Sequence, residues 1–150
     1  MLAAITAAVG FLVAVLWFDL MFDVQVWPHR RADLLPEPVI ESIASYYRRV
    51  TTDASPMNRL ISLVMVALLA LLIAQATRDV TPVWLSVVSL TLAALAIGLA
   101  LGRVVPAAKR LGSHPDSQRA TTALARSIFR DHVLFLALMV ALLAVQLVGG

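Results

Sequence analysis

Two carboxylates near the end of an apolar stretch are the first residues that could do chemistry. Asp19 and Asp23 follow a run of apolar residues that reaches Phe18, and their spacing places both on one face of a helix. Asp131 and His132 open another apolar stretch. Carboxylates at membrane depth are costly and point to function by default. Together with an imidazole they could hold a metal ion or relay protons.

Ion pairing with arginine is the competing interpretation of these acids. Such pairs would neutralise the carboxylates and fix the loops, and we expect Arg59 and Arg130 to pair with the first-span acids because each flanks a span at the same depth. Carboxylate-bridged metal bundles use a Glu-x-x-His motif, which this chain lacks. The sequence therefore favours ion pairs over a metal site. The candidate partners are Arg48, Arg49, Arg59, Arg103 and Arg130.

The cysteine and histidine counts limit the cofactors. With no cysteine, disulfides, thiolate metal sites, iron–sulfur clusters and covalently attached haem are excluded. His132 is the one histidine of three near an apolar stretch, whereas bis-histidine haem needs two on facing helices. No phosphate loop, nucleophile elbow or metalloprotease motif occurs. We therefore predict neither haem nor metal, which leaves a quinone or a lipid as the candidate bound molecule.

Aromatic residues accompany the acids. Tyr46 and Tyr47 are adjacent, and Trp17 lies two positions before Asp19. They could line a pocket for a quinone or an aromatic substrate, although tyrosine and tryptophan are also ordinary anchors at the membrane interface. If the chain is an enzyme, the predicted catalytic residues are Asp19, Asp23, Tyr47 and His132.

The composition indicates which elements must position these residues. The chain is 61% hydrophobic and 14% charged, against about 45–50% and about 25% in soluble domains. The apolar residues form four blocks, each close to the roughly 20 residues that a membrane-spanning helix needs. We predict an all-α integral membrane protein, a four-helix bundle in one domain. The expected spans are 2–22, 57–76, 81–102 and 132–149, with loops 23–56 and 103–131.

Both long loops show helical periodicity. Apolar residues recur at spacings of three and four between Val39 and Val50, while Glu37 and Glu41 occupy the other face, which is typical of an interfacial amphipathic helix. A similar pattern from residue 117 to 131 predicts a helix that continues into the last span.

The basic residues set the expected orientation. Five of the twelve lie between the first and second spans when Arg59, in the first turn of the second span, is included; six lie between the third and fourth, and one in the short turn. The positive-inside rule places the long loops in the cytoplasm and both termini outside, as in a bacterial inner membrane. We expect the basic face to bind anionic lipid rather than nucleic acid. The candidate lipid-binding residues are Arg48, Arg49, Arg110, Arg119, Arg126 and Arg130.

Small residues in the third span predict close helix packing. Ala94, Gly98 and Gly102 form a small-xxx-small pattern. The helix that approaches this stripe could belong to this chain or to a second membrane protein.

The layout resembles the anthrone-oxygenase-like family of small bacterial four-helix membrane proteins. The features that carry the resemblance are the acid-bearing first span, Val105-Pro106 after the third span, and the basic helix from Arg119 to His132 that enters the fourth. The resemblance implies a four-helix membrane fold and a role for His132.

Two functions from different classes fit these observations. The first is a non-enzymatic subunit that packs against a larger membrane complex, for example a respiratory or photosynthetic one, and binds lipid at its basic face. The alternative is a small membrane oxidoreductase or oxygenase that acts on a lipophilic quinone-like or polycyclic substrate. The sequence favours the subunit because it requires no further motif. A proton-coupled carrier fits least, because the centres of the last three spans carry no charge.

Overall fold

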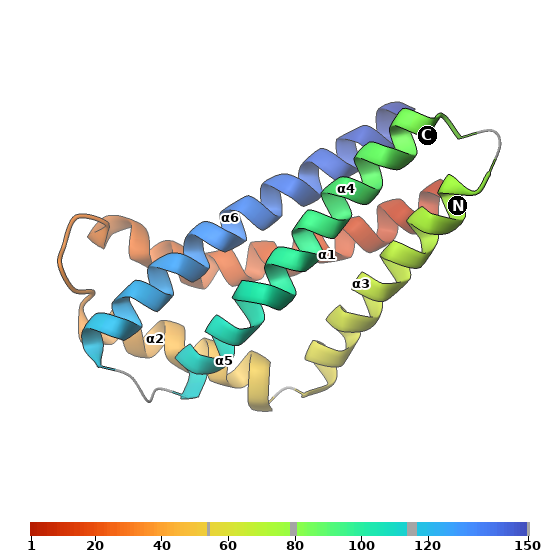
Figure 1. Ribbon diagram of the computed structural model, residues 1–150. Helices are drawn as coiled ribbons and strands as arrows, with labels where there is room; N and C mark the ends of the chain where they lie inside the picture. The colour runs from red at the N-terminus through yellow and green to blue at the C-terminus, as the bar shows by residue number, and fades with distance from the viewer. Residues whose placement is uncertain (54, 79–80, 114–116, 150) are drawn as a thin grey trace.

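Helices form the whole framework of the chain (Figure 1). The computed structural model describes residues 1–53, 55–78, 81–113 and 117–149, and this part contains no strand. The short helical segments are η1, a 3₁₀ helix at Val24–His29, and two π-helical segments, η2 at Arg49–Asp53 and η3 at Ala100–Val104. The α-helices are α1 Leu2–Asp23, α2 Glu37–Arg48, α3 Ser55–Ala76, α4 Val83–Leu99, α5 Val105–Ser113 and α6 Gln118–Gly149.

Four helical stretches in the described residues are long and apolar enough to cross a membrane, which confirms the predicted four-helix layout. They are Leu2–His29, Pro56–Ala76, Val83–Ser113 and Gln118–Gly149. Figure 1 shows the termini and the α3–α4 turn at one end of the bundle, and α2 with α5 at the other.

The helix at residues 117–131 and the fourth span form one continuous helix of 32 residues, as predicted. Helix α5 was not predicted. Pro106 is its second residue, just after the π-helical segment η3, and its residues Ala108 and Leu111 pack in one cluster with residues of α2. The helical path of the third span therefore continues through η3 and α5 to Ser113.

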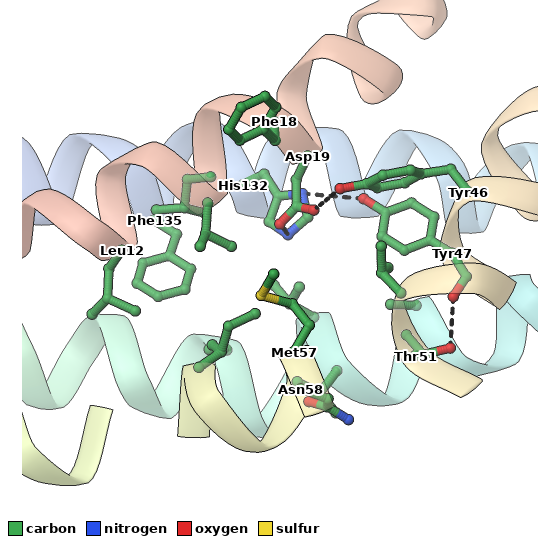
Figure 2. A pocket seen from close by; sticks show the side chains of 18 of the residues that line it. Leu12, Phe18, Asp19, Tyr46, Tyr47, Thr51, Met57, Asn58, His132 and Phe135 are labelled. Atoms are coloured by element: carbon green, nitrogen blue, oxygen red, sulfur yellow. Dashed lines mark hydrogen bonds and ion pairs between the residues drawn. The ribbon is translucent and has the colours of Figure 1, made fainter. Parts of the chain in front are cut away.

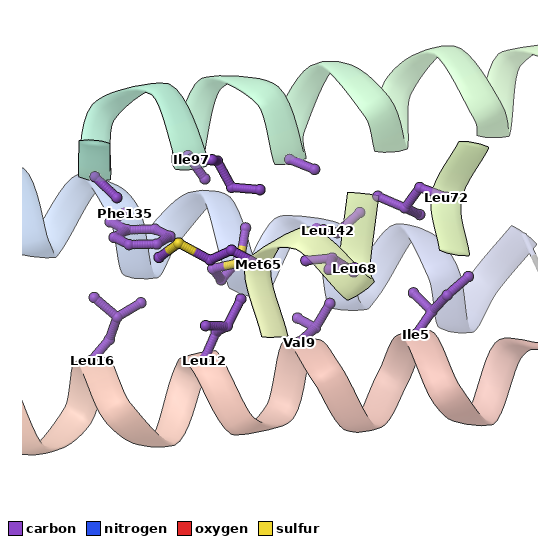
Figure 3. Packing of buried hydrophobic residues seen from close by; sticks show 14 residues of the cluster. Ile5, Val9, Leu12, Leu16, Met65, Leu68, Leu72, Ile97, Phe135 and Leu142 are labelled. Atoms are coloured by element: carbon purple, nitrogen blue, oxygen red, sulfur yellow. The ribbon is translucent and has the colours of Figure 1, made fainter. Parts of the chain in front are cut away.

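The bundle core is built from apolar residues at helical spacing (Figure 3). On α1 they are Ile5, Val9, Leu12 and Leu16, all nearly inaccessible to solvent. They pack against residues of the other three long helices, including Leu68, Leu72, Ala93, Ala96, Ala100, Met139 and Leu142. One stripe of each long helix thus faces the bundle axis.

The predicted small-residue stripe faces outward. Ala94, Gly98 and Gly102 are exposed, and a Cβ atom added at either glycine would meet nothing within 4 Å. Inside the bundle, α4 packs through Ala93 and Ala96, and η3 through Ala100, all of which are buried in the core. No helix in the described part of the chain therefore packs against this stripe, and packing against a second membrane protein stays a prediction.

A buried amide pair links three helices within the bundle. The side chains of Gln75 on α3 and Gln146 on α6 exchange hydrogen bonds of 3.2 and 3.1 Å, and Gln146 also donates to the Ser89 hydroxyl on α4 at 2.7 Å. Because every one of these partners is buried, a shift in helix register would leave polar groups unpaired in an apolar interior.

Candidate functional site

Helix α2 is fixed by packing at the loop end of the bundle. Its residues Ile40, Ile43, Ala44 and Tyr47 are buried in a cluster with residues of α5 and α6. The helix itself was predicted over 39–50, but its apolar face lies against protein rather than forming a free surface. The chain before it is also held, since Thr122 accepts a hydrogen bond from the Leu35 amide at 3.2 Å.

A glycine allows α2 and α5 to approach closely. A Cβ atom at Gly112 would lie 2.7 Å from the backbone nitrogen of Arg48, closer than real contacts allow. The Arg48 Nε–H donates to the Gly112 carbonyl at 3.1 Å. This contact fixes the last turn of α2. The two tyrosines of that turn then lie against the end of α1.

Asp23, Tyr47 and His132 form a buried network at this end of the bundle. The Tyr47 hydroxyl donates to Asp23 Oδ1 at 2.8 Å, and His132 Nδ1 lies 2.6 Å from Asp23 Oδ2. Asp23 is 1% exposed, and the other two residues 2% each. In its ionised form Asp23 only accepts hydrogen bonds, and in that form the His132 Nδ1–H is the donor of this contact. The second ring nitrogen, Nε2, is left to exchange protons with other groups.

Asp19 and Tyr46 extend the network toward open space. The Tyr46 hydroxyl donates to Asp19 Oδ1 at 2.6 Å, while Asp19 Oδ2 lies 3.8 Å from His132 Nε2. The Tyr46 ring stacks on Phe22 with centroids 3.9 Å apart. The two acids, predicted to share a helix face, thus lie near different nitrogens of the His132 ring, Asp23 near Nδ1 and Asp19 near Nε2.

The predicted pairing of these acids with arginine is wrong. Their partners are two tyrosines and a histidine, and Arg59 and Arg130 are both exposed. Arginine does pair with the neighbouring acid, since Arg103 Nε donates to Asp131 Oδ2 at 3.1 Å. The hydrogen-bond partners of Asp19 and Asp23 come from α2, which carries both tyrosines, and from α6, which carries His132.

A cavity of about 340 Å³ opens beside the network (Figure 2). Its polar lining comes from Asp19, Tyr46, Tyr47, His132 and two residues at the α2–α3 junction, Thr51 and Asn58. The rest of the lining is apolar and includes Leu12, Met65 and Phe135. Such an apolar space with a few convergent polar groups is the usual form of a small-molecule site.

Both π-helical segments border this cavity. Val50 and Thr51 of η2 and Ala100 and Val104 of η3 line it. The Thr51 hydroxyl donates to the Tyr47 carbonyl at 2.7 Å. Isolated π-helical turns occur frequently at functional sites because they reorient side chains at some cost in helix geometry.

Burial keeps both tyrosines protonated. Burial first, and the nearby carboxylates second, raise the pKa of Tyr46 and of Tyr47 well above the usual value, which is about 10. Both hydroxyls therefore remain hydrogen-bond donors to Asp19 and Asp23 throughout the physiological pH range.

These pKa shifts predict an alkaline transition. A raised pKa in the folded state stabilises the fold fully below about pH 10, and the contribution is lost as pH rises further. Since the chain has only these two tyrosines, tyrosinate absorbance reports on them alone. We expect none in the folded protein at about pH 10.5, where the denatured chain should be largely ionised. An equal tyrosinate signal in both states would contradict their burial.

The other candidate residues are spread over the same end of the bundle. Among the described residues, no group of three or more acids and histidines is arranged to hold a metal ion. Arg48 and Arg126 donate to backbone carbonyls, the latter to His29 at 2.9 Å and to Ala32 at 2.5 Å. Lipid binding by the exposed Arg49, Arg110, Arg119 and Arg130 stays a prediction.

The structure thus brings all four predicted catalytic residues together and adds Tyr46, which the sequence placed only among the aromatic candidates. Compared with known proteins, the chain matches no family model, no curated protein and no solved structure. The resemblance to the anthrone-oxygenase-like family therefore stays a prediction from the layout, and the functional inference rests on the site.

Proposed function

We propose that this chain is a small membrane enzyme, an oxidoreductase or oxygenase, that acts on a lipophilic quinone-like or polycyclic molecule bearing a hydroxyl group. The observation that carries the proposal is the buried Asp23–His132–Tyr47 network, which meets an apolar cavity through His132 and Asp19. An acid–base group beside an apolar cavity suits a substrate with one acidic proton and an otherwise apolar body.

The buried network favours an enzyme over a purely structural subunit. Burying charged groups is costly, and replacing such groups with packed apolar residues is often neutral or stabilising. A bundle that served only as a packing surface would not need two acids and a histidine at 1–17% side-chain exposure. Polar groups kept in an interior at such a cost commonly mark functional sites.

Each residue has a distinct role in the proposed reaction. Asp23 orients the His132 ring, and Tyr47 holds Asp23 in place. His132 Nε2 accepts the substrate hydroxyl proton, and Asp19 stabilises the resulting imidazolium from 3.8 Å. The phenolate left behind is richer in electrons than the phenol and loses them more readily. With dioxygen as oxidant, a hydroquinone gives the quinone and hydrogen peroxide.

Binding and turnover test the proposal. Naphthol should raise the melting temperature of the purified protein, whereas naphthalene, which lacks the hydroxyl, should raise it less. Naphthohydroquinone should be oxidised faster than it oxidises spontaneously, and isotopically labelled dioxygen would show whether oxygen enters the product. If neither compound stabilises the protein and oxidation is not accelerated, the enzyme proposal fails.

We further propose that the site lies on the cytoplasmic side of a bacterial inner membrane, with α2 at the membrane surface. Eleven of the twelve basic residues belong to the segments at the same end as the site, which is the pattern of cytoplasmic loops. An alkaline phosphatase fused to the C-terminus should therefore be active, and a fluorescent protein that folds only in the cytoplasm should stay dark there. The reverse pattern would overturn the orientation.

A further inference from the structure

The cavity beside the network has a polar and an apolar end. Figure 2 shows Leu12 and Phe135 at one end of the lining and Tyr46 and Tyr47 at the other, with Asp19 and His132 between them. Leu12 and Phe135 also belong to the bundle core. A ligand whose hydroxyl meets Asp19 and His132 would therefore extend its apolar part toward the middle of the bundle.

The size of the cavity limits what it can hold. Its volume of about 340 Å³ lies near the lower end of the roughly 300–1,000 Å³ found for small-molecule sites. This space suits two or three fused rings and is too small for a phospholipid with two acyl chains. The volume therefore favours a compact ring compound over a membrane lipid.

The exposed part of the lining is apolar. Among the described residues that line the cavity, only Phe18 on α1 and Met57 on α3 are well exposed, at 61% and 46%. In Figure 2, Met57 extends from α3 toward Asp19 and His132. Both residues belong to helical stretches that are apolar enough to cross a membrane. The cavity therefore reaches the molecular surface beside these two side chains.

Further exposed apolar residues lie on the same two helices. Leu60 and Leu63 on α3 are each more than 40% exposed, as are Trp17 and Met21 on the side of α1 that borders α6. Among these α3 residues stands one exposed charge, Arg59. The apolar residues contact lipid when the helices span a bilayer, because apolar side chains are favourable there. A molecule dissolved in the bilayer would meet this side of the protein directly.

We propose that a membrane-dissolved fused-ring phenol enters the cavity laterally from the bilayer, between α1 and α3 and past Phe18 and Met57. This inference rests on the proposed function and adds the substrate class and its route. The phenol slides in with its rings toward Leu12 and Phe135, and its hydroxyl stops at Asp19 and His132.

Spin labels can test whether this entrance faces lipid. The chain contains no cysteine, so Phe18→Cys and Met57→Cys each carry a single label in proteoliposomes. Dioxygen, which concentrates in the bilayer, should relax both labels strongly, and a water-soluble nickel chelate should relax them weakly. Leu63→Cys serves as the lipid-facing control and Arg49→Cys as the water-facing one. If the chelate relaxes Phe18→Cys and Met57→Cys as strongly as Arg49→Cys, the bilayer route is overturned.

Association kinetics test the route itself. Met57→Trp adds bulk at the entrance and should slow both association and dissociation of naphthol several-fold. Leu63→Trp, on the same helix but outside the cavity lining, should leave both rates unchanged. Equal rates in Met57→Trp and the parent would place the entrance elsewhere. A parent protein that binds no naphthol and does not accelerate naphthohydroquinone oxidation would overturn the proposed function, and this inference with it, whatever the spin labels report.

Discussion

Replacing His132 with asparagine is expected to lower the rate of naphthohydroquinone oxidation by about 10²- to 10⁴-fold, the usual contribution of a general acid or base. The asparagine amide can donate to Asp23 in place of Nδ1–H, which lies 2.6 Å from that carboxylate. No atom of asparagine replaces Nε2 as the proton acceptor. The measurement is quinone formation in proteoliposomes, with the melting temperature of each variant recorded beside it.

The matched control is His29→Asn, because the His29 side chain lies outside the cavity lining. This variant should oxidise the substrate at the parental rate. A second control, Tyr46→Phe, removes the hydrogen bond to Asp19 but keeps the ring that stacks on Phe22, and should reduce the rate less than His132→Asn. If His132→Asn remains folded and keeps the parental rate, His132 is not the proton acceptor.

The second large effect concerns stability. Asp23→Ala is expected to lower the free energy of unfolding by about 3–5 kcal/mol, because it removes the buried carboxylate that both His132 Nδ1 and the Tyr47 hydroxyl contact and leaves only their mutual contact at 3.3 Å. Asp23→Asn keeps the shape and one acceptor oxygen, so its cost should be smaller. Unfolding can be followed by circular dichroism in a mild detergent with increasing denaturant.

A double replacement separates the network from simple packing. Asp23→Leu combined with His132→Leu removes both partners, and its cost should be well below the sum of the single changes, since replacing a whole buried pair is often nearly neutral. Asp33→Ala, at an exposed position, provides the control and should change stability little. Additive costs at positions 23 and 132 would show that the two side chains do not stabilise each other.

The partners of the acids show where sequence reasoning stops. The four-residue spacing of Asp19 and Asp23 places them on one helix face, which is a local property of the chain. Their hydrogen-bond partners are Tyr46, Tyr47 and His132, and His132 lies 109 positions after Asp23. Arginines also flank the spans in the sequence, and their charge made them the expected partners. The packing of α2 and α6 against α1 brings the tyrosines and the histidine to the acids instead.

The helices themselves could be predicted because their signals are local. Block length and hydropathy predicted four apolar helices, and periodicity predicted both α2 and the continuous start of α6. Helix α5 could not be predicted in this way, because its nine residues follow a π-helical segment and include Pro106. It packs against α2, with the close approach at Gly112.

The inward faces and the cavity were decided only by the tertiary structure. Ala93, Ala96 and Ala100 pack in the core, whereas Ala94, Gly98 and Gly102, equally small and at similar spacing, face outward. Sequence could not distinguish the two stripes, because an all-apolar span has no polar face to orient it. The sequence by itself thus determined the helices and the residue types available for chemistry. The packing of α2 and α6 against α1 determined which of those residues meet, because each contact joins segments far apart in the chain.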